Sequence, residues 1–300
     1  MQDFLQHFIN GVSLGSIYAL IALGYTMVYG ILQLINFAHS DVYMIGAFSA
    51  YYGAMLLGFQ NRPGIAALVI LLFFAMAGCA LLGFTIERLA YRPLRKAPKL
   101  NILITAIGVS LLLQYSGQVI FGADPKVFPS VLQDSVITEF LGVQLKVLDV
   151  AVLLVTFVMM LALHYLIYHT KVGRAMRAVS TNMNVASMLG VNSDRIISFT
   201  FALGSALAGV GSVLVGMKYP KIEPLMGMMI GLKAFVAAVL GGIGNIPGAV
   251  LGGLLMGLSE EMVVGYLSST YRDALAFGIL ILILIFRPAG LLGRGGVEKV

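Results

Sequence analysis

Long stretches without a charged residue constrain this chain more than any other feature of its sequence. Only helices and closed barrels satisfy their backbone hydrogen bonds in lipid, and a bilayer core about 30 Å thick needs roughly 20 apolar residues of helix. Barrel strands alternate apolar and polar residues over about ten positions, whereas these stretches are continuously apolar. We therefore predict an all-α polytopic membrane protein. Among the stretches that contain no Asp, Glu, Lys or Arg are 4–40, 64–86, 100–121, 150–168, 196–217 and 234–259.

The overall composition supports the same class. The chain is 59% hydrophobic and 11% charged, whereas about a quarter of the residues of a soluble domain are charged. A net charge of +6 could indicate binding to nucleic acid. The basic residues, however, lie in short loops between the apolar stretches, where the positive-inside rule places them. We therefore expect the chain to contact membrane lipid and no nucleic acid.

The apolar pattern predicts about nine transmembrane or re-entrant helices in a single membrane domain that covers residues 1–300. Two of the segments, 227–241 and 248–265, are short. Fifteen residues of helix rise about 22 Å, which is less than a typical bilayer core. This pair therefore forms either two spans or a re-entrant hairpin. The predicted segments are 5–29, 41–58, 64–86, 100–121, 148–168, 196–216, 227–241, 248–265 and 272–287.

The basic residues between the segments indicate how the chain is oriented. Cytoplasmic loops carry an excess of Lys and Arg, and twelve basic residues fall on one side against six on the other. We therefore expect a periplasmic N-terminus, a cytoplasmic C-terminus, a cytoplasmic segment at about 171–192 and a periplasmic loop at about 122–147. The twelve are Arg88, Arg92, Arg95, Lys96, Lys99, Lys171, Arg174, Arg177, Arg195, Arg287, Arg294 and Lys299, and the six are Arg62, Lys126, Lys146, Lys218, Lys221 and Arg272.

The two halves of the chain share a pattern that one interpretation attributes to a parallel internal repeat. A polar or glycine-rich break follows an apolar segment at 34–39 and again at 241–247. Each group of segments then ends in an Arg-Pro pair, at 92–93 and at 287–288. Both groups run in the same direction, unlike the inverted repeats of many secondary transporters. The residues alone leave a repeat and unrelated halves equally open.

The cytoplasmic segment has a pattern typical of a short amphipathic helix. Four apolar residues follow a 3-4-3 spacing that places them on one side of a helix, and Gly190 is of the residue type that often ends helices. Two arginines are available on another face. Such a helix suits a groove on a cytosolic partner or the anionic membrane surface, and the residues alone leave both open. The apolar residues are Met176, Val179, Met183 and Ala186, and the arginines are Arg174 and Arg177.

Several glycine pairs are spaced for close packing of membrane helices. Residues 11–15 match the G-x-S-x-G pattern of a nucleophile elbow, but that motif requires a strand-to-helix turn and here it lies in a predicted membrane helix. Gly11 and Gly15 instead indicate a face on which another helix packs closely. Two further pairs have the same spacing and the same interpretation, Gly248 with Gly252 and Gly253 with Gly257.

Over nearly its whole length the sequence resembles the LivH-type permeases of bacterial branched-chain amino-acid ABC importers. The order and spacing of seven motifs carry this resemblance. Where the family usually has Gly-Glu after Asn-Phe-Ala-His, this chain has Ser40-Asp41, which keeps the acid and loses the glycine. The motifs are Asn10-Gly11-Val12-Ser13-Leu14-Gly15-Ser16, Gly24-Tyr25-Thr26-Met27-Val28-Tyr29-Gly30, Ile35-Asn36-Phe37-Ala38-His39, Tyr43-Met44-Ile45-Gly46, Glu87-Arg88-Leu89-Ala90-Tyr91-Arg92-Pro93, Gly173-Arg174-Ala175-Met176-Arg177-Ala178 and the late stretch 233–249.

The resemblance implies a role for the cytoplasmic segment, since the matching segment of the family couples the permease to its ATPase. On this basis Val179→Asp is expected to release the ATPase and to leave the permease folded. The resemblance also implies a LivM-like second permease, two cytosolic ATPase subunits and a periplasmic substrate-binding protein. Substrates would be leucine, isoleucine, valine or related neutral amino acids. The implied coupling residues are Arg174, Met176, Arg177, Val179, Met183, Ala186, Leu189 and Gly190.

Two polar or glycine-rich breaks are candidates for the translocation path or its gate. At the first break, Asp41 can simply complement a helix N-terminus, and a role in the gate is the alternative. At the second break, freed backbone groups at membrane depth are tolerated only against protein or a water-filled path. Lys233 is either a buried functional group or a snorkelling side chain. The candidate residues are Asn36, His39, Asp41, Gly242, Gly244, Asn245 and Pro247.

Three classes of function fit a polytopic membrane protein. A secondary transporter usually needs carboxylates within its spans for ion coupling, and here the segments are almost free of acids. An intramembrane enzyme needs a catalytic pair or a metal cluster, which the segments lack. The chain also has no G-x-x-x-x-G-K-[ST] motif for binding ATP. We therefore expect a transporter subunit that is no enzyme, needs no cofactor of its own and depends on partners that bind ATP.

Overall fold

The computed structural model describes residues 2–59, 63–95, 97–140 and 142–293. Helices dominate this part of the chain, which agrees with the all-α prediction. They are α1 (Gln2–Leu32), α2 (His39–Leu57), α3 (Ile65–Ile86), a π-helical turn (Glu87–Tyr91), α4 (Arg92–Leu94), α5 (Lys99–Phe121), α6 (Val147–His169), α7 (Lys171–Thr181), α8 (Met183–Met188), α9 (Ser193–Lys218), α10 (Met226–Gly241), α11 (Ile246–Tyr266), a 3₁₀ turn (Ser269–Tyr271) and α12 (Arg272–Phe286).

Seven helices in the described ranges are long and apolar enough to cross a membrane, which confirms the polytopic membrane class. They are α1, the helix formed by α3 to α4, α5, α6, α9, α11, and the helix formed by α12 with its preceding turn. Each predicted segment coincides with a helix to within a few residues. Helices α2 and α10 are not among these seven, so the count of nine spans stays a prediction. Which end of the bundle faces the cytoplasm also stays a prediction.

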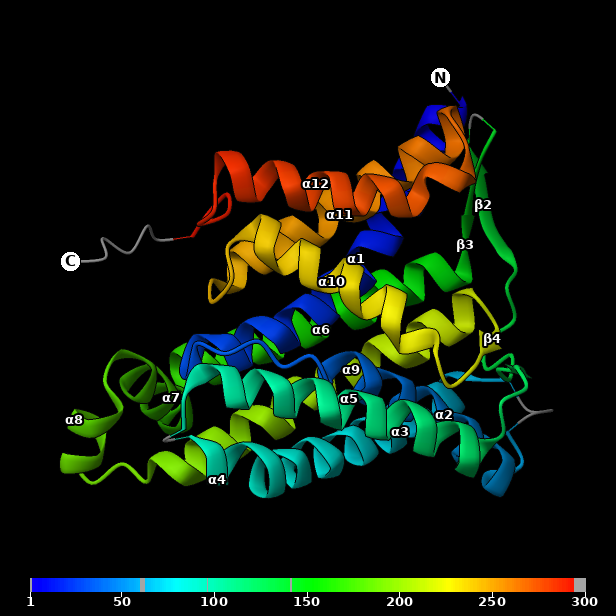
Figure 1. The fold of residues 1–300 in the computed structure, drawn as a ribbon. Coiled ribbons are helices and arrows are strands. Elements are labelled where there is room, and N and C mark those ends of the chain that lie inside the picture. Colours follow the sequence, from blue (N-terminus) through cyan, green and yellow to red (C-terminus); the bar gives the residue numbers. More distant parts are fainter. Residues whose placement is uncertain (1, 60–62, 96, 141, 294–300) are drawn as a thin grey trace.

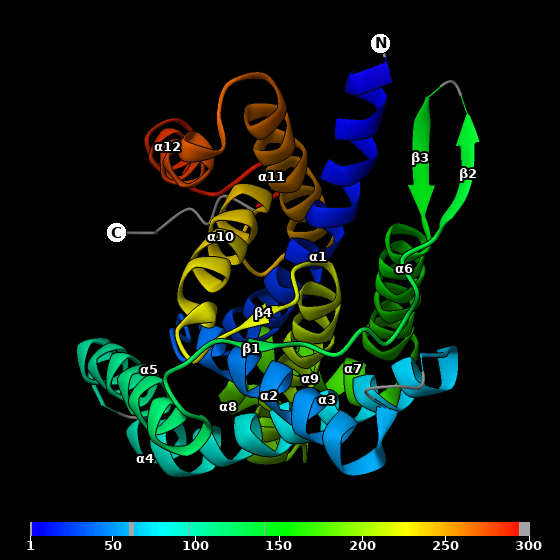
Figure 2. The ribbon, with the colours of Figure 1, turned by 90° about the vertical axis from the view of Figure 1, so that its right-hand side faces the viewer.

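Helices α1 and α9 form the centre of the bundle, and α5, α6 and α12 lie at its periphery (Figures 1 and 2). Small residues bring α1 close to α11. A Cβ on Gly257 would meet the backbone of Gly15, and one on Gly253 would meet the backbone of Ala19. A Cβ on Gly252 would likewise meet the backbone of α10 at Ala237. The glycine pairs therefore pack helices together, as their spacing predicts.

Replacing Gly257 with leucine should prevent correct packing of α1 on α11, because the side chain has no room beside the backbone of Gly15. Overpacking in a close contact typically costs about 1–3 kcal/mol, and rigid backbone on the other side puts this position at the upper end. The measurement is the monodisperse fraction in detergent size-exclusion chromatography. Gly278→Leu on α12 is the control, since a Cβ there meets nothing within 4 Å. Equal behaviour of the two variants would contradict the prediction.

The two ends of the bundle differ in structure. One end carries two antiparallel strand pairs, β1 (Lys126–Val127) with β4 (Lys221–Ile222) and β2 (Val136–Phe140) with β3 (Val143–Lys146). Three of these strands lie in region 122–147, for which the sequence predicts only a loop. The opposite end carries α7 and α8 (Figure 1). The functional features described below lie mostly at the α7–α8 end.

Candidate functional site

Helices α7 and α8 form a compact unit between the end of α6 and the start of α9. Three side chains fix its turns by accepting hydrogen bonds from backbone N–H groups at helix starts. Thr170 accepts from Gly173 at 3.0 Å, Asn182 from Val185 at 3.1 Å, and Asn192 from Arg195 at 3.0 Å. The sequence predicts one helix here, but Asn182 ends α7 and caps α8. Because each turn has its own cap, the α7–α8 unit has a defined shape at the surface.

The apolar side of the α7–α8 unit faces the protein's own interior, which corrects the expectation that it enters a partner's groove. Met176, Val179 and Ala186 are buried, and Met183 is half-buried. Met176 belongs to the same hydrophobic cluster as Ile167 of α6. Amphipathic spacing identifies an apolar face, but it does not tell whether that face meets a partner or the same chain. These buried residues therefore attach α7 and α8 to the rest of the bundle.

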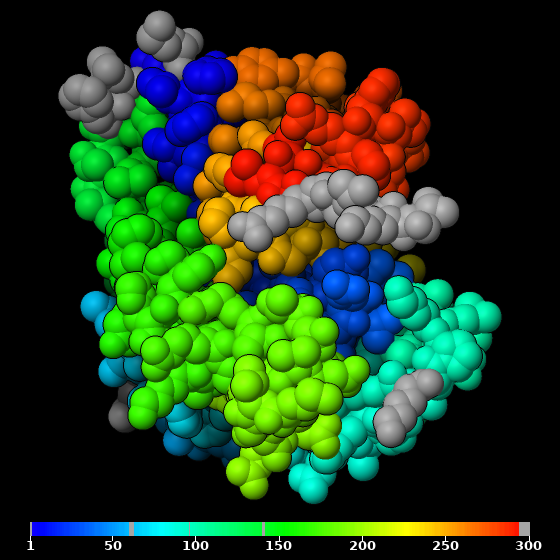
Figure 3. All heavy atoms as spheres, turned by 90° about the vertical axis from the view of Figure 1, so that its left-hand side faces the viewer, coloured from blue at the N-terminus to red at the C-terminus, as the bar shows by residue number. Residues whose placement is uncertain are grey.

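A different set of apolar side chains is exposed on the α7–α8 unit. Met188 is 86% exposed, Leu189 is 78% exposed, and Val185 is half-exposed. Arg174 is also exposed. Gly190, with φ of +83°, turns the chain directly after them. Leu189 and Gly190 belong to the set that the sequence suggests, whereas Val185 and Met188 do not. Figure 3 shows the unit, in light green, on one face of the molecule beside the end of α1.

Arg177 does not extend away from the protein. Its Nη1 donates a hydrogen bond to the backbone oxygen of Ile167, and its guanidinium carbon lies 5.4 Å from the centre of the Tyr168 ring. A cation over an aromatic face is attracted by the ring quadrupole. The sequence suggests that Arg177 reaches acceptors on a partner, but its described contacts attach α7 to the end of α6.

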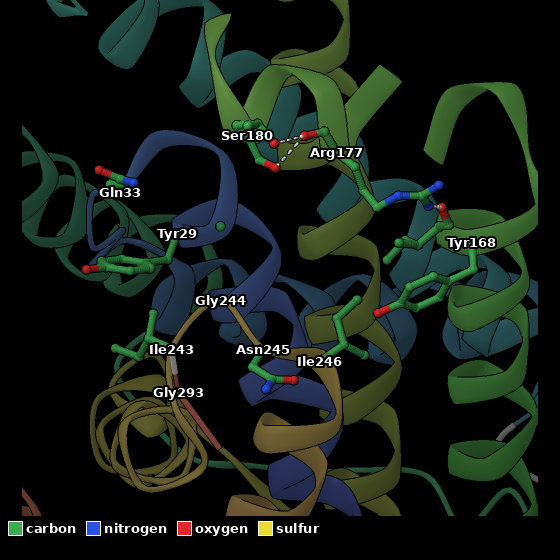
Figure 4. Close-up of a pocket in the computed structure, with 13 residues that line it drawn as sticks. Tyr29, Gln33, Tyr168, Arg177, Ser180, Ile243, Gly244, Asn245, Ile246 and Gly293 are labelled. Atoms are coloured by element: carbon green, nitrogen blue, oxygen red, sulfur yellow. Dashed lines mark hydrogen bonds between the residues drawn. The ribbon is translucent and has the colours of Figure 1, made fainter. Parts of the chain in front are cut away.

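A cavity of about 540 Å³ separates the α7–α8 unit from the turn between α10 and α11 (Figure 4). Five parts of the chain surround it: the end of α1, the end of α6, the helix α7, the α10–α11 turn and Gly293 after α12. No acidic residue lies among its lining residues, and Arg177 is the charged one. The lining residues are Tyr29, Gly30, Gln33, Ile167, Tyr168, Arg177, Ser180, Thr181, Ile243, Gly244, Asn245, Ile246 and Gly293.

The α10–α11 turn forms one wall of this cavity. Gly242 and Gly244 have φ of +105° and +90°, which side-chain-bearing residues rarely adopt. Asn245 caps α11 by accepting from the N–H of Gly248 at 3.4 Å, and Pro247 occupies its first turn. The carbonyl oxygens of Leu240 and Gly241 at the end of α10 accept from the N–H groups of Leu291 and Leu292 at 2.8 and 3.0 Å. The turn is thus a defined structure, held by the segment after α12.

The first break places polar residues in the interior, away from this cavity's lining. Asn36 and His39 are buried, and the Tyr91 hydroxyl donates to Asn36 Oδ1 at 2.8 Å. Asp41 is buried and accepts from Gln114 Nε2 at 3.0 Å and from a serine of α5. Asp41 therefore joins α2 to α5. The sequence groups the two breaks as one candidate path, but the structure brings only the second break to the cavity.

The ring of His39 has an unusual setting. The ring centre of Tyr25 lies 4.5 Å away, and the imidazole packs tightly against Gly24 of α1. Among the described residues neither ring nitrogen of His39 has a hydrogen-bond partner. No group of three or more His, Cys, Asp or Glu residues in these ranges could hold a metal ion. His39 is thus a buried polar residue within an aromatic neighbourhood.

Comparison with known proteins gives a consistent result. Residues 7–284 match the family described as "Branched-chain amino acid transport system / permease component". The chain belongs to this family. The permease is 44% identical to BraD, a high-affinity branched-chain amino acid transport permease of Pseudomonas aeruginosa, over 99% of this chain and 98% of that protein. It is also 44% identical to LivH of Escherichia coli K12, with the same coverage of both chains.

A solved structure shows a similar fold. It is an ABC transporter of the metal-chelate type in an inward-facing conformation, 16% identical to the permease, with a TM-score of 0.50. The similarity covers 95% of this chain and 88% of that one. The apolar helices and the permease relatives together make this chain a multi-pass protein of the inner membrane.

One of the family-like motifs builds an ion-pair bracket behind the α7–α8 unit. Glu87 is fully buried and accepts from Arg95 and Ser198. Arg95 also pairs with Asp194 Oδ1 at 2.6 Å, and Arg92 pairs with the other oxygen of Asp194. Because Ser198 and Asp194 lie in the first turns of α9, the bracket ties the start of α9 to the end of α3. The bracket thereby fixes the start of α9, the helix that follows the α7–α8 unit.

Sequence reasoning missed a set of buried charges. Lys233 is buried and paired with Glu260, so it does not snorkel. The sequence did contain a signal for these charges, because Lys233 and the Glu260–Glu261 pair flank the charge-free stretch 234–259. Helices α10 and α11 are antiparallel neighbours, which brings the two ends of that stretch together.

Proposed function

We propose that this protein is the permease subunit of an ABC importer and forms the translocation path for branched-chain amino acids. The match to the permease family over residues 7–284 carries the proposal. The absence of a P-loop motif from the sequence supports ATP hydrolysis on a separate subunit. The permease itself is then no enzyme and needs no cofactor. Its role is to convert the motion of the ATPase into opening and closing of the translocation path.

The exposed side of the α7–α8 unit is proposed to dock on a cytosolic ATPase. Met188 and Leu189 are exposed on a unit that three side-chain caps hold in shape, and Arg174 adds an exposed positive charge to the same unit. Apolar anchors at the centre of an interface contribute most of its binding energy. The buried residues Met176 and Val179 attach the unit that carries this surface to the rest of the bundle. Motion of the ATPase would reach the cavity through α7, which lines it.

Complete transport requires further partners. A second permease, LivM-like, would complete the path, two ATPase subunits would drive it, and a periplasmic binding protein would deliver the substrate. The substrate, a zwitterion without net charge, passes a wall that carries one cation, Arg177, and three isoleucines. No described residue of the cavity offers a carboxylate for the ammonium group. We therefore assign substrate selection mainly to the binding protein.

The α7–α8 end is proposed to lie in the cytoplasm, because twelve of the basic residues fall on that side. In a Cys79→Ala background, single cysteines at Ala97 and Ser187 should react with an impermeant reagent only from the cytoplasm. A cysteine at Gln133 should react only from outside. Labelling of Ser187→Cys in intact spheroplasts would show that the α7–α8 end lies outside, opposite to the proposed orientation. Two further sites, Gly295 and Gln60, lie outside the described residues.

The direct test is uptake in proteoliposomes that contain the permease, a LivM-like permease and the two ATPases. We expect ATP-dependent uptake of radiolabelled leucine when the binding protein is supplied, and none when either the ATP or the binding protein is omitted. Exchange of the binding protein for one with another specificity should change the transported amino acid. Uptake that continues without ATP would indicate a secondary transporter instead.

A further inference from the structure

Four charged side chains form a cluster between the interior of the bundle and its peripheral helix α12, away from the lining of the cavity. Lys233 stands near the middle of α10, and its Nζ lies 3.1 Å from Glu260 Oε1 of α11 and 2.8 Å from Asp273 Oδ1 of α12. Arg272 Nε lies 3.1 Å from the same Glu260 oxygen. Two positive and two negative groups meet, so the cluster is neutral as a whole. We refer to these four residues as the ion cluster.

A fourth helix joins the ion cluster through Tyr18. The hydroxyl of this α1 residue donates to Glu260 Oε2 at 2.9 Å. Glu260 therefore interacts with groups from α1, α10 and α12 at once. Since α1 is the most buried of the apolar helices, the cluster attaches the α10–α11 hairpin to the centre of the protein as well as to its periphery.

Two members of the ion cluster are deeply buried, whereas the side chains of Arg272 and Asp273 on α12 are 32% and 49% exposed. Glu260 is 1% exposed and Lys233 is 7% exposed. Removing a charge from its partner inside a protein leaves it without compensation, which is strongly unfavourable, and more so at membrane depth. The gap beside Lys233 between α10 and α12, lined by Met229, Val236 and Phe277, has no room for a water molecule. Neither water nor a substrate can reach Lys233 through this gap.

The other end of the same hairpin is held by hydrogen bonds to the segment after α12 and borders open space. The turn between α10 and α11 contains Gly242 and Gly244, whose positive φ angles are rarely adopted by residues with a side chain. It borders the 540 Å³ cavity, so it has space to move into. Hinges form where a few residues can absorb changes of φ and ψ. One end of the hairpin is thus fixed by buried ion pairs, while the other end is held by hydrogen bonds to Leu291 and Leu292 and lies next to open space.

We infer that Lys233 and Glu260 are positioning residues, which pin the α10–α11 hairpin to α1 and α12 so that the hairpin pivots at the ion cluster. Movement during the transport cycle then occurs at the Gly242–Asn245 end, where the cavity lies. This inference rests on the proposed transport function. It assigns the ion cluster a constant, closed state, in contrast to a gate that opens in each cycle.

Cross-links at the two ends of the hairpin distinguish a pivot from a gate. In a Cys79→Ala background, Met229→Cys with Phe277→Cys spans the closed gap beside the ion cluster. Tyr29→Cys with Ile246→Cys spans the cavity. A bifunctional thiol reagent should reduce leucine uptake about tenfold or more when it joins the cavity pair, because closing motions set the rate of such cycles. Joining Met229→Cys to Phe277→Cys should leave uptake close to that of the unlinked protein. Loss of uptake with this pair would overturn the inference.

Charge substitutions test the same residues with a different readout. Glu260→Gln should lower the amount of leucine transported per ATP hydrolysed about tenfold, since a loosened pivot lets the ATPase turn over without moving the hairpin. The separate variant Lys233→Arg keeps the positive charge and should retain most of the wild-type ratio of leucine transported per ATP hydrolysed. Glu261→Gln is the matched control, because that neighbour faces His7 at 3.9 Å instead of the cluster. A residue with a merely structural role would change the yield and leave the ratio unaltered.

The outcomes separate this inference from the proposed function. Wild-type proteoliposomes that fail to transport leucine in the same assay would refute the proposed function. Normal wild-type uptake together with an unchanged ratio in Glu260→Gln would refute the pivot alone. If Glu260→Gln does not assemble, the Met229 and Phe277 cross-link still decides, because neither residue belongs to the ion cluster.

Discussion

Replacing both Met188 and Leu189 with aspartate should release the ATPase subunits and leave the permease folded. Both side chains are largely exposed, so the substitutions bury no charge within the permease itself. At the proposed interface each aspartate would replace an apolar anchor. Loss of one buried anchor typically costs about 2 kcal/mol or more, which corresponds to roughly thirtyfold weaker binding. Co-purification of the ATPase with the permease in mild detergent measures the effect.

Two controls separate loss of docking from loss of folding. Leu267→Asp changes a residue that is 73% exposed at the opposite end of α11, and it should retain the full ATPase complement. Val179→Asp should instead prevent folding, since Val179 is 2% exposed within the cluster that contains Ile197 and Phe201. A stable Val179→Asp permease that has lost its ATPase would restore the original expectation. Full retention of the ATPase by the Met188 and Leu189 double variant would show that the ATPase docks at another surface.

The membrane helices could be predicted from the sequence, because the requirement for them is local. A span needs about 20 consecutive apolar residues, and that requirement does not depend on the rest of the fold. The 234–259 stretch also shows its break, since Gly242, Gly244 and Pro247 lie where an apolar helix cannot continue unchanged. The structure ends α10 at Gly241 and starts α11 at Ile246. The packing role of Gly253 and Gly257 followed from their spacing for the same reason.

The direction that the α7–α8 unit faces could not be predicted, because it depends on the rest of the bundle. Met176 and Val179 form the same apolar stripe whether a partner or the chain's own α6 and α9 cover them. The exposed Met188 lies outside that stripe and therefore carries no periodic signal. Only the position of α8 at the edge of the bundle shows that it is available to a partner (Figure 3).

The buried ion pairs show a second limit of sequence reasoning. Glu260 finds its partners on three other helices, and Tyr18 is separated from it by 242 positions in the chain. A lone charge in an apolar stretch indicates that a partner is needed, but the sequence does not say which residue supplies it. Asp194, which pairs with Arg92 and Arg95, is a similar case near α8.

The bracket around Glu87 should contribute strongly to the stability of the folded permease. Glu87→Ala removes a fully buried carboxylate from Arg95. Breaking a buried pair typically costs about 3–5 kcal/mol, because the remaining charge lacks compensation. We expect about 3 kcal/mol here, at the lower end of that range, since Arg95 keeps its contact with Asp194. The free energy of unfolding in mixed detergent with SDS measures this loss.

Two companion variants test whether the buried charge is the cause. Arg92→Ala also breaks an ion pair with Asp194, but both side chains of that pair are exposed by more than 40%. Exposed pairs contribute about 0–1 kcal/mol, so this variant should stay near the wild type. Glu87→Met combined with Arg95→Met removes both charges and should recover most of the stability lost in Glu87→Ala, because apolar replacement of a whole buried pair is often neutral. If Arg92→Ala and Glu87→Ala lose equal stability, burial of Glu87 is not what makes the bracket strong.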